Sequence, residues 1–187
     1  MRKRTILTIA AIVAMLALMI GGSVAYFSAE EKTQNVITTG GVDIELKEWA
    51  DADKTTAFPT DGVDGVTPGT EITKIVEVTN TGASPAWIRV KAEKAIALAK
   101  ADIQPDLTLV ELDLNTRDWT EQDGWYYYNR ILAPEETTVP LFTAVTFSNA
   151  MGNEYQNSTA TVAVTAQAVQ SANNGGSATE AVGWPAE

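Results

Sequence analysis

The chain has 187 residues, which is enough for one domain with its own core and leaves little room for a second. It contains no cysteine and no histidine, which excludes disulfides, zinc–thiolate sites and catalysis by histidine. With 13 basic and 24 acidic residues, its formal net charge of −11 disfavours binding to nucleic acid and to anionic lipid. We therefore expect an acidic, solvated surface and no cofactor.

The first 25 residues have the layout of a secretory signal peptide. Three basic residues at 2–4 precede an uncharged apolar run at 5–20, and small residues follow. Cleavage after Ala25 would leave Tyr26 as the mature N-terminus. The alternative is a retained membrane anchor, because with its flanking residues the apolar run reaches about 20 residues, near the lower limit for a span. The pattern favours cleavage, with any membrane contact made only through the uncleaved segment.

Residues 26–40 are predicted to form an arm in front of the folded domain. They are mostly polar, with aromatic residues at Tyr26 and Phe27 and an apolar pair at Val36 and Ile37. Two adjacent glycines end this segment and act as a break before the first regular alternation of apolar and polar residues.

The main domain is placed at 41–170, where short runs with strand periodicity alternate with turn-rich segments. Alternating apolar and polar residues with many β-branched side chains are typical of half-buried strands. The cleanest alternation lies at 159–169, and Pro140 within the run 137–147 indicates an edge strand or a bulge. Strands are predicted over 42–47, 72–79, 86–92, 107–112, 125–128, 137–147 and 159–169.

The segments between these strands are less regular. Residues 50–70 are expected to form a long surface loop, and 115–124 a polar turn region. Residues 148–156 fit a loop or a single helical turn. The alanine- and lysine-rich stretch 93–102 fits either a helix or an extension of the strand before it. The tail 171–187 is predicted to be loose, with its one tryptophan able to dock back onto the domain.

About seven or eight strands without sustained helical periodicity predict an all-β fold, a sandwich or barrel of antiparallel strands. Several short motifs stand out by their order and spacing, at 21–28, 35–44, 68–74, 78–82, 85–90, 125–128, 132–134, 138–142, 153–156 and 166–170. Together they resemble the TasA/camelysin (CalY) family of exported proteins in Gram-positive bacteria. The first of them, at the end of the apolar leader, looks like the signal peptides that a dedicated SipW-type signal peptidase processes.

This resemblance implies a jelly-roll-like antiparallel β-sandwich and assembly into the fibres of a biofilm extracellular matrix. It also implies head-to-tail self-association, in which the N-terminal arm of one subunit adds a strand to the next. Edge strands with unpaired backbone groups accept such extended segments. In this sequence the donor strand would be 26–39, with Tyr26, Phe27, Val36 and Ile37 as its apolar contacts. The alternatives are an arm that folds back on its own domain and an arm that stays disordered.

A second function remains open at this point, namely a monomeric surface module or accessory matrix protein that binds a polysaccharide or a protein. Residues 125–128, one tryptophan followed by three tyrosines, fit a platform for stacking sugar rings. They fit equally well the two alternating faces of a strand, one in the core and one at the surface.

Enzymatic function is not expected, although some members of the family carry a metallopeptidase label. Without histidine, the His-Glu-x-x-His zinc site cannot exist, and the usual nucleophile–base pairs are missing too. The spacing of four aspartates in the loop 50–70 departs from the standard calcium loop, so they are only weak calcium candidates. These residues are Asp51, Asp53, Asp61 and Asp64.

Overall fold

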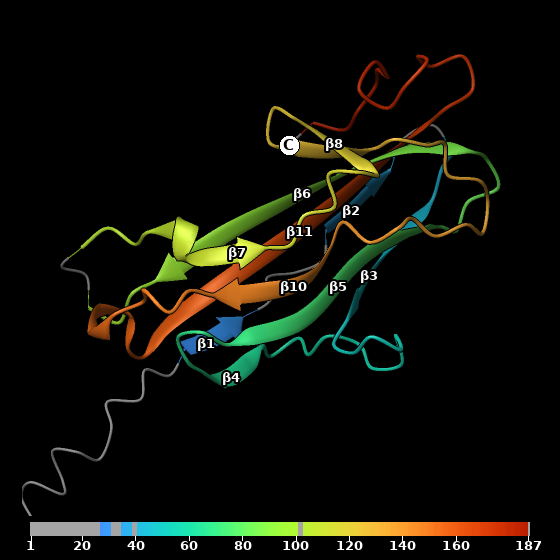
Figure 1. Cartoon of the computed structure of the whole chain (residues 1–187). Helices are drawn as coiled ribbons and strands as arrows, with labels where there is room; N and C mark the ends of the chain where they lie inside the picture. The colour runs from blue at the N-terminus through green and yellow to red at the C-terminus, as the bar shows by residue number, and fades with distance from the viewer. Residues whose placement is uncertain (1–26, 31–34, 39–40, 101–102, 187) are drawn as a thin grey trace, which may run out of the picture.

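The computed structural model describes residues 27–30, 35–38, 41–100 and 103–186. In these residues the chain forms a two-layer β-sandwich (Figure 1), which confirms the predicted all-β antiparallel sandwich class. The predicted signal peptide and its cleavage site between Ala25 and Tyr26 lie outside the described residues. No helix among the described residues is long and apolar enough to cross a lipid bilayer.

One sheet has the strand order β4-β1-β11-β6-β9-β8, and β2 also pairs with β11. The other sheet has the order β3-β5-β10-β7. The strands of the first sheet are β1 (Phe27–Glu30), β2 (Asn35–Thr38), β4 (Val63–Val66), β6 (Ala86–Ala97), β8 (Trp119–Gln122), β9 (Trp125–Tyr128) and β11 (Ser158–Gln170). Those of the second are β3 (Ile44–Trp49), β5 (Glu71–Asn80), β7 (Val110–Leu112) and β10 (Phe142–Phe147).

The long pair β6–β11 forms the spine of the first sheet (Figure 1). It is antiparallel and runs without interruption from Ala86 opposite Gln170 to Ala97 opposite Thr159. The regular alternation of β11 explains this, because every second residue from Ser158 to Ala168 is buried. The inward side chains are mostly alanine and valine, which lets the second sheet approach closely.

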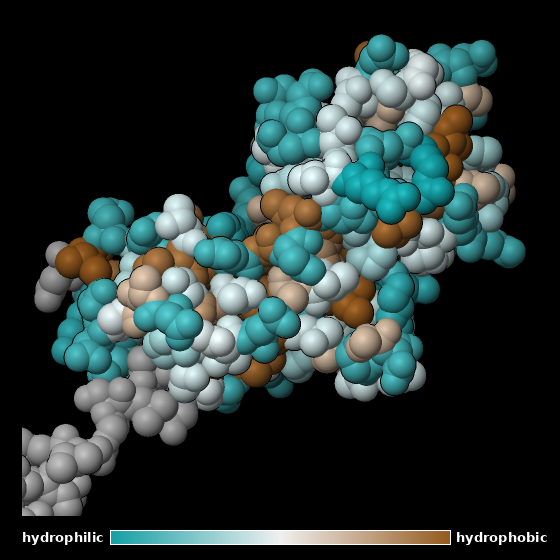
Figure 2. Space-filling model, in the orientation of Figure 1, coloured by the Kyte–Doolittle hydropathy of each residue, from teal (hydrophilic) through white to brown (hydrophobic). Residues whose placement is uncertain are grey.

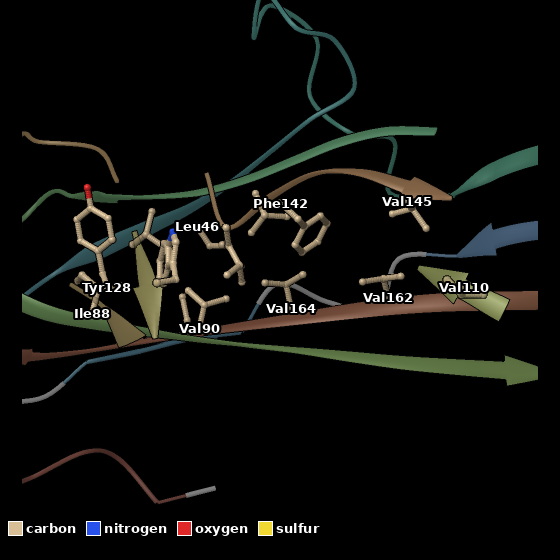
Figure 3. Packing of buried hydrophobic residues seen from close by; sticks show 14 of the residues in the cluster. Leu46, Ile88, Val90, Val110, Tyr128, Phe142, Val145, Val162 and Val164 are labelled. Atoms are coloured by element: carbon tan, nitrogen blue, oxygen red, sulfur yellow. The ribbon is translucent and has the colours of Figure 1, made fainter. Parts of the chain in front are cut away.

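The core lies between the two sheets (Figure 3). Valines 162 and 164 of β11 and Val90 of β6 point towards Leu46 and Phe142 of the facing sheet. The largest fully buried side chains include Trp119 and Tyr128, whose ring centroids lie 5.0 Å apart. In a chain without cysteine, this packed layer supplies the main stabilisation of the fold.

The surface carries its larger exposed apolar side chains singly, at Ile103, Leu107, Ile131 and Val182. Figure 2 shows hydrophobic side chains in separate patches between hydrophilic ones on the face that it displays. Scattered apolar residues of this kind are normal on soluble domains.

Several element boundaries differ from the sequence prediction. Of the two alternatives for 93–102, the extension of the strand is confirmed as far as Ala97, because β6 continues to that residue along its partner β11. The expected strand over 137–147 begins only at Phe142, after Pro140, and 107–109 form a 3₁₀ turn before β7. The helical turn predicted within 148–156 is present at Asn153–Tyr155.

Two strands were not predicted because their segments read as turns. β4 lies inside the expected loop 50–70, and β8 lies inside the expected turn region 115–124. Both are four residues long and carry glycine or charged residues, so neither shows a clear alternation. Each is a strand because a neighbouring strand supplies its hydrogen-bond partners.

Candidate functional site

The edge of β11 that faces away from β6 is occupied by the N-terminal arm. β1 pairs in parallel with β11, from Phe27 opposite Ser158 to Glu30 opposite Thr161. β2 continues the same arrangement further along, from Asn35 opposite Thr165 to Thr38 opposite Ala168. Four residues join the two arm strands, whereas three residues of β11 lie between the two paired stretches. Between the two paired stretches, the arm therefore has one residue more than β11.

The start of the arm lies between two strands. On its other side β1 pairs antiparallel with β4, where Phe27 is opposite Val66 and Ala29 is opposite Val63, with an irregularity between them. The later arm strand, β2, lies beside β3 of the other sheet. The arm thus closes the sandwich along the side where the two sheets meet (Figure 1).

Three of the four predicted donor-strand residues lie in these paired strands, namely Phe27 in β1 and Val36 and Ile37 in β2. Tyr26 lies outside the described residues. The arm pairs with β11 of its own chain, which is the fold-back arrangement considered as an alternative above. Donation of the arm to a second subunit stays a prediction. The sequence did not reveal which strand edge pairs with the arm. For the chain's own arm, that edge belongs to β11.

A buried ion pair joins two strands of the second sheet, β3 and β5. The Nζ atom of Lys74 on β5 lies 3.0 Å from Oε1 of Glu48 on β3, and the two side chains are 3% and 2% exposed. Neither carboxylate oxygen nor the ammonium nitrogen has a hydrogen-bond partner in the described structure. Lys74 also lies 4.0 Å from the centroid of the Phe58 ring. The sequence prediction did not include this pair. Glu48 nevertheless occupies one of the alternate positions of β3 whose side chains are buried.

The C-terminal segment forms a second, smaller cluster on the outer face of the first sheet. The tail is predicted to be loose with a docking tryptophan, and Trp184 does pack on the domain, while Ala178 and Ala181 are also buried against Trp87 and Trp125. The Nε1 atom of Trp87 donates a 2.8 Å hydrogen bond to the carbonyl of Asn174. The missed signal is the pair of small alanines before the docking tryptophan.

Arg89 is the centre of this outer cluster. Its guanidinium carbon lies 4.1 Å from the ring centroid of Trp125 and 4.6 Å from that of Trp184. It donates hydrogen bonds of 2.9 Å and 2.6 Å to the side-chain oxygen of Gln167, which is 1% exposed. Through Arg89 and Gln167, the tail therefore contacts the outer face of β11 at the stretch that pairs with β2.

The aromatic run 125–128 is divided between the two faces of β9. Trp125 and Tyr127 belong to the outer cluster under the tail, whereas Tyr126 and Tyr128 pack against the main core. This confirms the alternating-face interpretation. The outer pair is only 5% and 6% exposed, so the tail covers the surface on which a sugar ring would stack.

Replacing Trp184 with alanine should lower the free energy of unfolding by about 1–3 kcal/mol, because the Arg89 and Tyr127 contacts of its ring are lost. Urea unfolding followed by fluorescence measures this change. Val182→Ala is the matched control in the same segment. Val182 is 73% exposed, and its substitution should change stability by less than about 0.5 kcal/mol. Equal effects of the two substitutions would contradict docking of the tail.

Among known proteins, the chain matches the sequence profile of a family described as camelysin metallo-endopeptidase over residues 1–109. The chain belongs to this family. The match confirms the resemblance to the TasA/camelysin group that the motifs indicate. No curated protein and no solved structure matches this camelysin-family chain.

The family description implies a metal ion, and the residues of this camelysin-family chain do not fit a peptidase metal centre. The whole sequence lacks histidine and cysteine. In the described parts of the chain, no three acidic residues gather closely enough to hold an ion. Of the buried carboxylates, Glu48 pairs with Lys74, while Glu77 accepts from the indole of Trp49 and from Lys54. No catalytic step through a metal follows from this arrangement.

The four weak calcium candidates, Asp51, Asp53, Asp61 and Asp64, are not brought together into such a group. Asp51 is used inside its own loop, where its carboxylate accepts hydrogen bonds from the backbone N–H groups of Thr55 and Thr56. The backbone bond from Thr55 contributes most, followed by Thr56, and together they lower the pKa of Asp51 to about 2.

The lowered pKa of Asp51 predicts how the free energy of unfolding changes as the pH falls. The folded carboxyl has a pKa of about 2, whereas its ordinary pKa is 3.8, so its contribution to stability is present above about pH 4 and is lost as the pH falls towards 2. Urea midpoints measured between about pH 6 and pH 2 should fall more steeply in the parent than in Asp51→Asn. Asp53→Asn is the control and should follow the parent profile. Identical slopes for parent and Asp51→Asn would contradict the assignment.

Proposed function

We propose that this chain is an exported structural protein without catalytic activity, and that it is a subunit of extracellular matrix fibres. Its subunits assemble head to tail, with the arm 26–39 of one subunit added to β11 of the next. The observation that carries the proposal is the parallel pairing of β1 and β2 with one edge of β11.

An arm from a second subunit can form the same backbone hydrogen bonds as the chain's own arm. Exchange of an identical element between subunits needs no new interface, and a head-to-tail exchange that does not close into a ring produces a filament. Gly41, just after the arm, has a φ of +74° and open space around its Cβ position. Glycine adopts this backbone region without strain, so it suits a hinge about which the arm can change direction.

Composition supports export and argues against catalysis. The apolar leader with its basic start is typical of a secretory signal peptide, here of the type cleaved by a SipW-like peptidase. The high negative charge favours solubility outside the cell and disfavours nucleic acid as a partner. The protein would then be secreted, at the cell surface or in a biofilm matrix, with copies of itself as its main partner.

Electron microscopy of the mature protein over a range of concentrations tests this proposal. Regular filaments whose number grows with concentration are the expected result. Protein that stays monomeric while circular dichroism shows an intact β fold would overturn the fibre-subunit proposal, and would favour an accessory or binding role that needs a partner.

The absence of peptidase activity is a separate prediction. Purified protein incubated with casein and added Zn²⁺ should release no more peptide than a blank, because the chain offers no imidazole or thiolate to bind the ion. Adding a chelator should leave the urea unfolding curve unchanged. A metal-dependent cleavage rate that co-purifies with the protein would contradict this prediction.

A further inference from the structure

We propose that Asn174 is a deamidation site that is protected while the C-terminal tail is docked, and that its deamidation releases the tail irreversibly. Asn174 is followed by Gly175, and this is the one Asn-Gly pair in the sequence. An asparagine before glycine loses its side-chain ammonia more readily than one before any other residue, because glycine has no side chain to hinder the reaction. The proposal does not depend on fibre formation.

The packing of the tail requires both residues of this pair. Gly175 has a φ of +74°, and a Cβ atom there would lie 3.0 Å from the backbone nitrogen of Ala181, so a side chain would be strained and crowded. The Nδ2 atom of Asn174 donates 3.0 Å hydrogen bonds to the carbonyls of Gln170 and Val182. Its Oδ1 atom accepts a 2.9 Å bond from the N–H of Val182. The labile pair thus follows from the way the tail folds.

Asn174 also joins the tail to the first sheet. Its backbone carbonyl accepts the 2.8 Å hydrogen bond from the indole of Trp87 on β6. Its side chain closes the loop between 174 and 182, which contains the buried residues Ala178 and Ala181 of the outer cluster. A change in the carboxamide of Asn174 therefore affects the contacts that dock the tail.

The reaction begins when the backbone nitrogen of Gly175 attacks the side-chain carbon Cγ of Asn174. A new C–N bond closes a five-membered succinimide ring, and the bond between Cγ and Nδ2 breaks. The side-chain nitrogen leaves as ammonia with the proton that the Gly175 N–H gives up. Water then opens the ring at one of its two carbonyls, which leaves aspartate or isoaspartate at position 174. Water is the only co-reactant.

The docked tail protects Asn174 because its carboxamide is fixed by three hydrogen bonds to Gln170 and Val182. The carboxamide must leave these bonds before Cγ can turn towards the nitrogen of Gly175. Local opening of the tail is then required before the reaction, and the rate follows the fraction of molecules whose tail is open.

The product cannot restore the docked state. Both partners of Nδ2 are carbonyl oxygens, so a carboxylate at position 174 would face them without a proton to share, which is unfavourable. Isoaspartate in addition lengthens the backbone by one carbon and displaces the carbonyl that Trp87 binds. An undocked tail uncovers Trp87 and Trp125, each of which is 5% exposed in the docked state. A deamidated copy therefore presents an aromatic surface that a newly made copy lacks.

The first test measures protection in the full chain, expressed so that it is processed as in the cell. The protein is incubated at mildly alkaline pH, and deamidation of Asn174 is followed by peptide mapping with mass spectrometry. Trp184→Ala removes a docking contact and should raise the deamidation rate about tenfold, because more molecules have an open tail. Trp184→Phe keeps an aromatic ring and should give an intermediate rate. The control Val182→Ala keeps the backbone groups that bind Asn174 and should match the parent.

The second test measures release of the tail. Ala181→Cys places a thiol at a position that is 7% exposed, in a chain that has no cysteine of its own. Asn174→Asp imitates one deamidation product, and with it the thiol should react with a disulfide reagent about tenfold faster than without it. Asn173→Asp is the matched control, because it adds the same charge at the exposed residue just before. It should leave the labelling rate unchanged.

Three outcomes would overturn the proposal. Equal deamidation rates in the parent and Trp184→Ala, including none in either, would show that docking does not protect a labile site. Equal labelling rates with Asn174→Asp and Asn173→Asp would show that loss of the amide does not release the tail. Loss of the β fold in Asn174→Asp, measured by circular dichroism, would show that the change acts on the whole domain instead of on the tail.

Discussion

Deleting residues 26–39 should abolish filament formation while leaving the sandwich folded, because the deletion removes the strand that we propose is donated but none of β3 to β11. The truncated domain should be less stable than the parent, since β11 then pairs only with β6 and β4 loses its neighbour. Electron microscopy and urea unfolding measure the two effects on the same sample. Truncated protein that still forms regular filaments would contradict strand donation.

Adding back the missing strand sharpens this experiment. A synthetic peptide of residues 26–39 should bind the truncated domain and raise its urea midpoint, because ligands that bind only the folded state stabilise it by mass action. A peptide of the same composition in scrambled order is the control and should have little effect. Equal stabilisation by both peptides would mean that binding does not depend on pairing along β11.

Replacing Lys74 alone with methionine should be strongly destabilising, by about 3–5 kcal/mol, because the carboxylate of Glu48 is then buried without a partner. Urea unfolding of parent and variant gives this difference directly. Lys47→Met on β3 is the matched control. Its partner Glu45 is 57% exposed at the side chain, so this substitution should change stability by no more than about 1 kcal/mol.

A second substitution tests whether the lost stability comes from the buried charge or from lost packing. Adding Glu48→Leu to Lys74→Met should restore most of the lost stability, because no charge is then left in the core. If the double variant were as unstable as the single one, loss of packing around Phe58 would explain the effect better than the unpaired carboxylate.

The long strands could be predicted from sequence because their own side chains encode them. The alternation of β11 and the β-branched residues of β5 fix which face is buried, whatever the neighbouring strand is. β4 and β8 could not be predicted in this way, since each depends on a hydrogen-bonding neighbour that lies far away in sequence or has no clear pattern of its own.

The candidate site was predicted only in part. The sequence indicated the arm and its apolar residues, but strand pairing is a long-range choice, so the edge of β11 was found only in the structure. Glu48 and Lys74 were in the inward phase of their strands, yet charged residues at such positions are normally assigned to the surface. The docking of the tail depends on aromatic side chains of β6 and β9 that lie far from the tail in sequence, so the sequence indicated the docking of Trp184 but not the surface that receives it.

The pairing of the arm with β11 also has a kinetic consequence. The first and the last strands of the described chain are neighbours in one sheet, and β11 also provides the partner of β6. A ribosome makes β11 last, so the first sheet cannot close until nearly the whole chain has been synthesised. Contacts between residues that lie far apart in the sequence form slowly. A chain whose first sheet needs the final strand therefore stays extended for longer. Such a chain would be well suited to passing through a narrow translocation channel before it folds.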